Sequence, residues 1–173
     1  MPNDRTTDER LRAIEDRLEI YNLVASHPLS ADTGADYYSR AIYLEDGSMD
    51  LGGGKGAVGN EAIAAIVKTP EHQAAIAGGL AHFASLPHVT IDGDTAVATS
   101  YLQILMPHPT AEPMALSGHG TTRGFRIHRV GANRWELVRT GAGWRIKRRT
   151  LRPLDGTAPA RELLRSALAP FEP

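Results

Sequence analysis

The spacing of hydrophobic residues separates a helical first part of the chain from a strand-rich second part. Near the N-terminus, apolar residues recur at intervals of three and four, which places them on one face of a helix. They are Leu11, Ile14, Leu18, Tyr21 and Ala25. Thr7 and Asp8 can cap this helix, which we expect to run to about residue 26 and to end at Pro28.

Further elements follow from periodicity and from turn residues. We expect two shorter helices, at about 33–44 and from Asn60 onward, with a short strand at 48–51 between them. Past residue 80 the residues become β-branched and apolar, and this composition predicts strands at 82–91, 95–106, 114–130, 135–140 and 144–151. Gly131-Ala132-Asn133 reads as one of the intervening turns, and a C-terminal helix is expected at about 158–169.

This order of elements predicts the fold class. Helices first and an antiparallel meander afterwards indicate an α+β protein rather than a parallel βαβ sheet. A curved sheet wrapped on a long N-terminal helix would form a cone around an apolar pocket. At 173 residues, we expect one domain over 1–173.

Composition excludes several classes of function. The formal net charge is -1, which does not favour a nucleic-acid or anionic-membrane partner. No apolar run reaches the roughly 20 residues of a membrane span. The absence of cysteine removes a thiolate nucleophile and a disulfide framework. The polar N-terminus does not resemble a secretory signal, so we expect a cytoplasmic protein.

Seven histidines offer candidate chemistry. His27, His72 and His128 stand in contexts typical of exposed or loop positions, whereas the other four lie on or beside the expected strands; they are His82, His88, His108 and His119. A metal site built from these four is an alternative, but no close His-x-His spacing supports it. The basic residues near the end of the sheet are expected to point mostly to solvent; they are Arg145, Lys147, Arg148, Arg149 and Arg152.

Five segments carry a resemblance to a known family. They are SADTGADYY at 30–38, AHF at 81–83, SYLQILMPH at 100–108, SGHGTTRG at 117–124 and TGAGWRIKRR at 140–149. In this order they resemble the SnoaL-like branch of the NTF2-like superfamily over about residues 8–152, and within it the scytalone dehydratase-like members. The resemblance implies a cone-shaped α+β barrel, an apolar pocket, no cofactor and a homotrimer.

The resemblance also implies site residues. His82 corresponds to a catalytic base, Asp32 to the carboxylate that orients it, and His108 to a second pocket histidine. The pocket tyrosines of scytalone dehydratase fall on Ala31 and about Leu51, so scytalone is not the expected substrate. Candidate substrate contacts are Phe83, Thr122, and the phenols of Tyr43 and Tyr101.

The chemistry expected of such a pair is proton transfer. Histidine is a base near neutral pH, and a carboxylate on its far nitrogen fixes the tautomer. The first hypothesis is a cofactor-independent lyase that eliminates water or another small group from a hydrophobic aromatic or polycyclic substrate. The alternatives are an isomerase or cyclase of the ketosteroid-isomerase or polyketide-cyclase kind, and a non-catalytic small subunit of a ring-hydroxylating oxygenase. In a purely structural interpretation, Asp32 caps the second helix and His82 packs within its strand.

Overall fold

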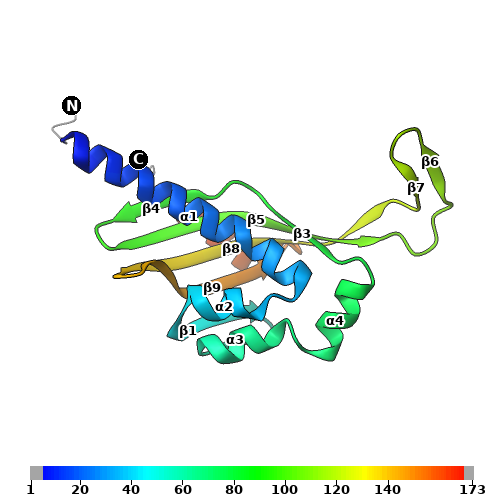
Figure 1. The fold of residues 1–173 in the computed structure, drawn as a ribbon, viewed down its shortest axis with the longest axis horizontal. Helices are drawn as coiled ribbons and strands as arrows, with labels where there is room; N and C mark the ends of the chain where they lie inside the picture. Colours follow the sequence, from blue (N-terminus) through cyan, green and yellow to red (C-terminus); the bar gives the residue numbers. More distant parts are fainter. Residues whose placement is uncertain (1–5, 170–173) are drawn as a thin grey trace.

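The computed structural model describes residues 6–169, which form helices and a strongly curved sheet (Figure 1). The helices are α1 (Thr7–Thr33), α2 (Asp36–Ile42), α3 (Asn60–Ile66), α4 (Pro70–Ala77) and α5 (Ala158–Ser166). The strands are β1 (Tyr43–Gly52), β2 (Lys55–Val58), β3 (Ala81–Ala84), β4 (His88–Asp92), β5 (Thr95–Pro107), β6 (Met114–Leu116), β7 (Gly120–Thr122), β8 (Phe125–Thr140) and β9 (Gly143–Pro153).

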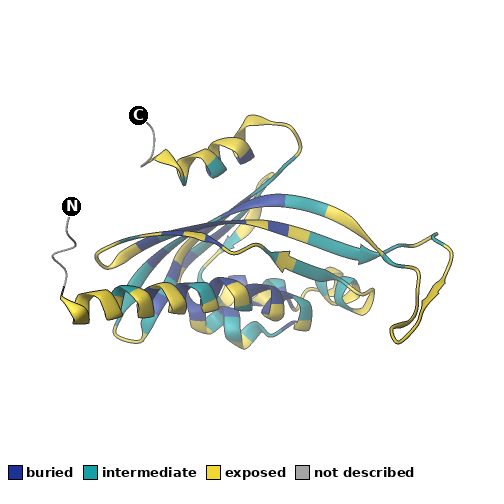
Figure 2. Cartoon of the chain, turned by 90° about the horizontal axis from the view of Figure 1, so that it is seen from above, coloured by how far each residue is buried: buried dark blue, intermediate teal, exposed yellow. Residues whose placement is uncertain are grey.

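The main sheet is mixed and open. Its strand order is β2-β1-β9-β8-β5-β3, with β4 also paired to β5, and β1 runs parallel to β9. The α+β class is therefore confirmed, but the sheet does not close into the expected barrel, because β2 and β3 lie at opposite ends of the order. Helices α1 to α4 lie on one side of the sheet, the inner face, and α5 lies on the other, the outer face (Figure 2).

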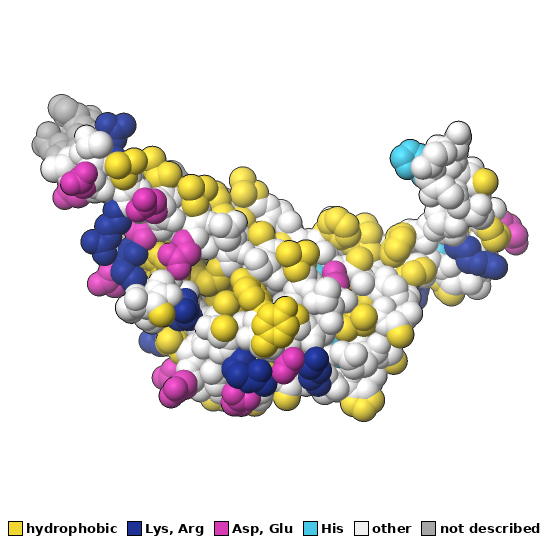
Figure 3. Space-filling view, viewed as in Figure 1, with side chains coloured by type: hydrophobic (Ala, Val, Ile, Leu, Met, Phe, Trp, Pro, Cys, Tyr) yellow, Lys and Arg dark blue, Asp and Glu magenta, His cyan; other side chains and the backbone are white. Residues whose placement is uncertain are grey.

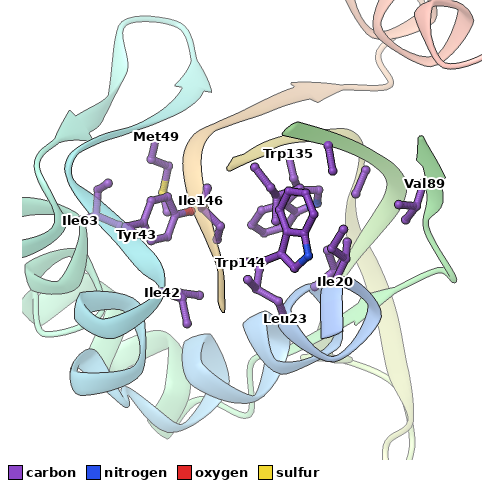
Figure 4. Close-up of a cluster of buried hydrophobic side chains, with 14 residues drawn as sticks. Ile20, Leu23, Ile42, Tyr43, Met49, Ile63, Val89, Trp135, Trp144 and Ile146 are labelled. Carbon is purple, nitrogen blue, oxygen red and sulfur yellow. The ribbon is translucent and has the colours of Figure 1, made fainter. Parts of the chain in front are cut away.

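The core lies between α1 and the inner face of the sheet (Figure 4). Trp135 on β8 and Trp144 on β9 are completely buried there together with Ile20 of α1. On the outer face, Ala132 of β8 packs beneath Ala160 and Leu163 of α5. Alternate residues of β8 therefore serve the two faces, as the pleat of a strand requires.

Helix α1 is longer than the sequence pattern predicts. It starts at a capping box, in which the Thr6 hydroxyl accepts the Glu9 N–H and the Glu9 carboxylate accepts the Thr6 N–H. It then continues through Pro28 to Thr33, because the turn that contains Pro28 is buried against the sheet and this burial offsets the missing N–H. Gly34, at φ 67°, ends the helix in the left-handed conformation.

Two glycine-containing segments behave differently from the expectation. Gly131-Ala132-Asn133 is not a turn, since β8 runs straight through it. A Cβ at residue 131 would lie 2.8 Å from Leu151 Cδ1, so glycine is present there for close strand packing. The expected strand at 114–130 is instead divided, and β6 and β7 form a separate hairpin arm that projects from the body (Figures 1 and 3).

The expected strand at 82–91 is also divided. Its first part is β3 and its second is β4, and both pair with β5. Pro87 lies in the break, where a missing N–H cannot continue a ladder. The break leaves β3 free to lie against the end of α1.

Candidate active site

Asp32 and His82 are joined by two hydrogen bonds. The ring Nδ1 of His82 lies 2.5 Å from Asp32 Oδ1, and the backbone N–H of His82 donates to Asp32 Oδ2 at 2.8 Å. Asp32 stands in the last turn of α1 and His82 near the start of β3. Helix α2 has no side-chain cap, so Asp32 does not have the capping role of the structural alternative.

This geometry determines the tautomer of His82. An ionised carboxylate only accepts hydrogen bonds, so Nδ1 carries the proton and Nε2 keeps its lone pair. Burial lowers the pKa of His82 from its usual 6.5, and this effect exceeds the opposing effect of Asp32, which raises it. At neutral pH the ring is therefore a neutral base with a fixed orientation.

His82 lines a small cavity between the helices and the inner face of the sheet. The cavity has a volume of about 160 Å³, and its walls come from helices α1 to α4 and from strands β1, β3, β5, β8 and β9. Just over half of the lining residues are apolar, such as Ile63, Ile66 and Leu102, and the rest are histidine, serine and arginine. An engineered apolar cavity of about 150 Å³ accommodates benzene, so this one has the size of a single ring.

Strand register explains which sheet residues face the cavity. His82 on β3 pairs with Ile104 on β5, which pairs with Arg129 on β8, so the three lie in one row of the inner face. Four residues along β8 from Arg129, Asn133 lies on the same face. These positions are far apart in sequence and meet only because three strands pair in this register.

Cationic and imidazole groups complete the site. Arg149 on β9 is 3% exposed, and its Cζ lies 4.7 Å from the ring centroid of Trp135. His27 of α1 lies edge-on against the same indole, with the ring centroids 5.1 Å apart. His72 of α4 donates from Nε2 to the Ala31 carbonyl at 2.7 Å, which fastens α4 beside the Asp32–His82 pair.

The sequence pattern misplaces these groups for identifiable reasons. His27 is buried rather than exposed, because α1 continues past residue 26. Arg149 points inward because a register shift between β8 and β9 leaves Lys147 and Arg148 both exposed and moves the next residue to the inner face. The irregularity belongs to the pairing of two strands, so no local sequence signal indicates the buried arginine.

The structure does not bring the other site residues of the sequence analysis into the cavity. His108 and Thr122 belong to the base and the second strand of the arm, where the backbone N–H of Ala111 donates to His108 Nδ1 at 3.0 Å. Phe83 and Tyr101 are neighbours of the inward-facing His82 and Leu102, so alternation turns them to the outer face. Tyr43 is 3% exposed within the core cluster beside the cavity, and burial raises its pKa to about 12.

The four strand-associated histidines do not converge. Within residues 6–169, no three His, Asp or Glu side chains come together as ligands for a metal ion. Along the same part of the chain, no helix has the length and apolar character needed to cross a membrane.

Fold and site together define a curved-sheet α+β protein with a His–Asp pair at a small cavity. The chain belongs to the SnoaL-like family, whose domain matches residues 12–150. An NTF2-like protein with a cystatin-like fold from Novosphingobium aromaticivorans is 38% identical, with a TM-score of 0.82 over 94% of this chain and 98% of that chain. The comparison with curated proteins found no match.

Two further solved structures share the fold at lower identity. A proposed aromatic ring hydroxylase from N. aromaticivorans is 25% identical, with a TM-score of 0.59 over 82% of this chain and 90% of that chain. A proposed scytalone dehydratase from the same species is 18% identical, with a TM-score of 0.60 over 86% and 88%. At 18% identity the likeness concerns the fold alone.

Proposed function

We propose that this protein is a cofactor-independent lyase in which His82 is the base and Asp32 orients it. The observation that carries the proposal is the 2.5 Å contact between the two side chains at the edge of a small, largely apolar cavity. It gives the ring a fixed tautomer and leaves Nε2 to accept a proton. Solved structures of the same fold that are described as dehydratases are consistent with this chemistry.

The elimination needs one base. Nε2 of His82 takes the proton next to a carbonyl group, and the carbonyl oxygen receives the electron pair. As the electron pair returns, the bond from the β-carbon to the hydroxyl breaks, and the imidazolium gives its proton to the leaving oxygen as water forms. Asp32 stabilises the imidazolium between the two transfers.

Cavity size restricts the substrate. A volume of about 160 Å³ suits one ring with small substituents, because an apolar cavity of about 150 Å³ binds benzene. We therefore propose a monocyclic hydroxylated carbonyl compound rather than a polycyclic one.

Mass spectrometry tests the reaction class. Purified protein incubated with a panel of monocyclic β-hydroxy carbonyl compounds should convert at least one to a product lighter by one water. The reaction should proceed with chelator present, and the His82→Gln variant should give no product above the uncatalysed background. If a compound is converted without change of mass, the lyase proposal is wrong.

An isomerase is the second candidate, and the position of His108 favours it. A proton shift needs only a base that takes and returns one proton, whereas in an elimination without a second acid the same ring must also reach the leaving oxygen. With His108 at the base of the arm, the cavity has His82 as its base and no contribution from that second histidine. The mass measurement separates the two reactions.

We also propose that the protein assembles as a homotrimer. Three large apolar side chains on the outer face are between 49% and 60% exposed, namely Phe83, Tyr101 and Ile127. An apolar surface of this kind is typical of a subunit interface. Light scattering should give three times the chain mass of 18.7 kDa, and Ile127→Ser with Phe83→Ser should shift it toward the monomer. A wild-type monomer would contradict the proposal.

A further inference from the structure

Two arginines face the cavity without an acidic partner. Arg149 donates from Nε to Asn133 Oδ1 at 3.2 Å, and its Nη1 lies 3.8 Å from Met49 Sδ. In the part of the chain that the structure describes, no Asp or Glu forms an ion pair with Arg149 or Arg129. A guanidinium stays protonated when buried, so both charges persist.

The groups around these arginines do not neutralise them. Asp32 is occupied by the ring and backbone N–H groups of His82. Burial, and then the charge of Arg149, lowers the pKa of His27 well below its usual value, so that ring is neutral. Asp155 is exposed, and its pKa is lowered chiefly by hydrogen bonds from Thr157 and only last by Arg129.

Two buried hydrogen-bond donors in this group of residues also have no partner among the described residues. The Nε–H of Arg129 and the Nδ2 amide of Asn133 are buried and have no hydrogen-bond partner within residues 6–169. Both lie on the inner face of β8, and Arg149 on the neighbouring β9 contacts Asn133. Buried donors are almost always paired, and a cation–π contact with one ring restores only a small part of the hydration that a buried guanidinium loses.

We propose that Arg149 and Arg129 bind a carboxylate on the substrate, with Asn133 positioning Arg149 through its hydrogen bond, so that the ligand is a compact aromatic or cyclic acid. A carboxylate has two oxygens that accept in one plane, which matches the planar donors of a guanidinium. One ring and one carboxylate fit a cavity of about 160 Å³. The inference deepens the proposed function, on which it rests for treating this cavity as the substrate site.

Binding of an unreactive acid tests the proposal separately from catalysis. Calorimetric titration of the wild-type protein with benzoate and with benzamide, its neutral analogue, should give an affinity roughly 10- to 100-fold higher for benzoate. Arg149→Met should abolish this preference, while Arg149→Lys should keep part of it. Arg126→Met, on the exposed part of β8, is the matched control and should leave the preference unchanged.

Each result of the titration either supports or overturns the carboxylate proposal. Equal affinity for the two probes, no benzoate binding at millimolar concentration, or a preference that survives Arg149→Met would overturn the proposal. If Arg149→Met does not fold, Arg129→Met takes its place with the same expected loss. His82→Gln should retain the preference for benzoate, so a failure of the lyase proposal leaves this result unaffected.

Discussion

Replacing His82 with glutamine should lower turnover of the substrate by about 10²–10⁴-fold, which is the usual contribution of one general base. Glutamine keeps a polar side chain of similar length, and its amide can still donate to Asp32, so the fold should be retained. It cannot accept and release a proton, so the chemical step should lose its base. The measurement is kcat by product mass on the compound found in the screen, with circular dichroism as the check of folding.

Two further variants test whether the activity is lost with the base itself or through a general disturbance of the sheet. His128→Gln changes an exposed histidine on β8 and should retain wild-type kcat. Asp32→Asn should lose most of the activity, because an asparagine amide can donate to Nδ1 and favour the wrong tautomer of His82. Wild-type turnover in His82→Gln would assign the proton transfer to another group.

The pH dependence provides a second test of the same pair. Activity needs neutral His82, and burial keeps its pKa below 6.5 despite the raising effect of Asp32. The value of kcat/KM should therefore be constant at neutral pH and fall only on the acid side of 6.5. Asp32→Asn removes the group that raises the pKa, so the acid limb of its residual activity should move to lower pH.

The association of Asp32 with His82 could be predicted from the sequence. The order of the motifs was enough to associate Asp32 with His82, because both stand at the ends of elements whose order is fixed by the family fold. Their 2.5 Å contact depends on the local chain path, which the resemblance already contains. The helix-first order likewise indicated the α+β class, because the order of elements gives the fold class without any knowledge of strand register.

The parts that sequence reasoning missed depend on irregular pairing. Trp144 and Ile146 alternate with polar residues, so strict alternation along the strand would place Arg149 on the solvent side. One extra residue in β9 moves Arg149 to the inner face instead. Gly131-Ala132-Asn133 has the composition of a turn, but Gly131 packs against Leu151 across the sheet. In both cases a neighbouring strand decides the outcome, and no local pattern reports on it.

Trp144→Ala should be the most destabilising single change, at about 3–5 kcal/mol, because it leaves a large cavity between α1 and the sheet. Trp144 is 0% exposed, and its indole N–H donates to Asp16 of α1 at 3.2 Å. Arg139 joins the same network by pairing with Asp16 and by lying over the Trp144 ring, with its Cζ 4.5 Å from the centroid. The loss corresponds to a decrease in Tm of about 6–20 °C for a chain of this length.

This destabilisation should extend to the candidate site, because α1 carries both Asp16 and Asp32 and is held to the sheet at both places. Trp144→Phe retains most of the apolar volume and should lose clearly less stability than Trp144→Ala. Tyr37→Ala removes an aromatic ring that is 72% exposed on α2 and should change stability by no more than about 0.5 kcal/mol. Thermal unfolding of the three variants checks the order, and a Trp144→Ala protein as stable as Tyr37→Ala would show that α1 is held by other contacts.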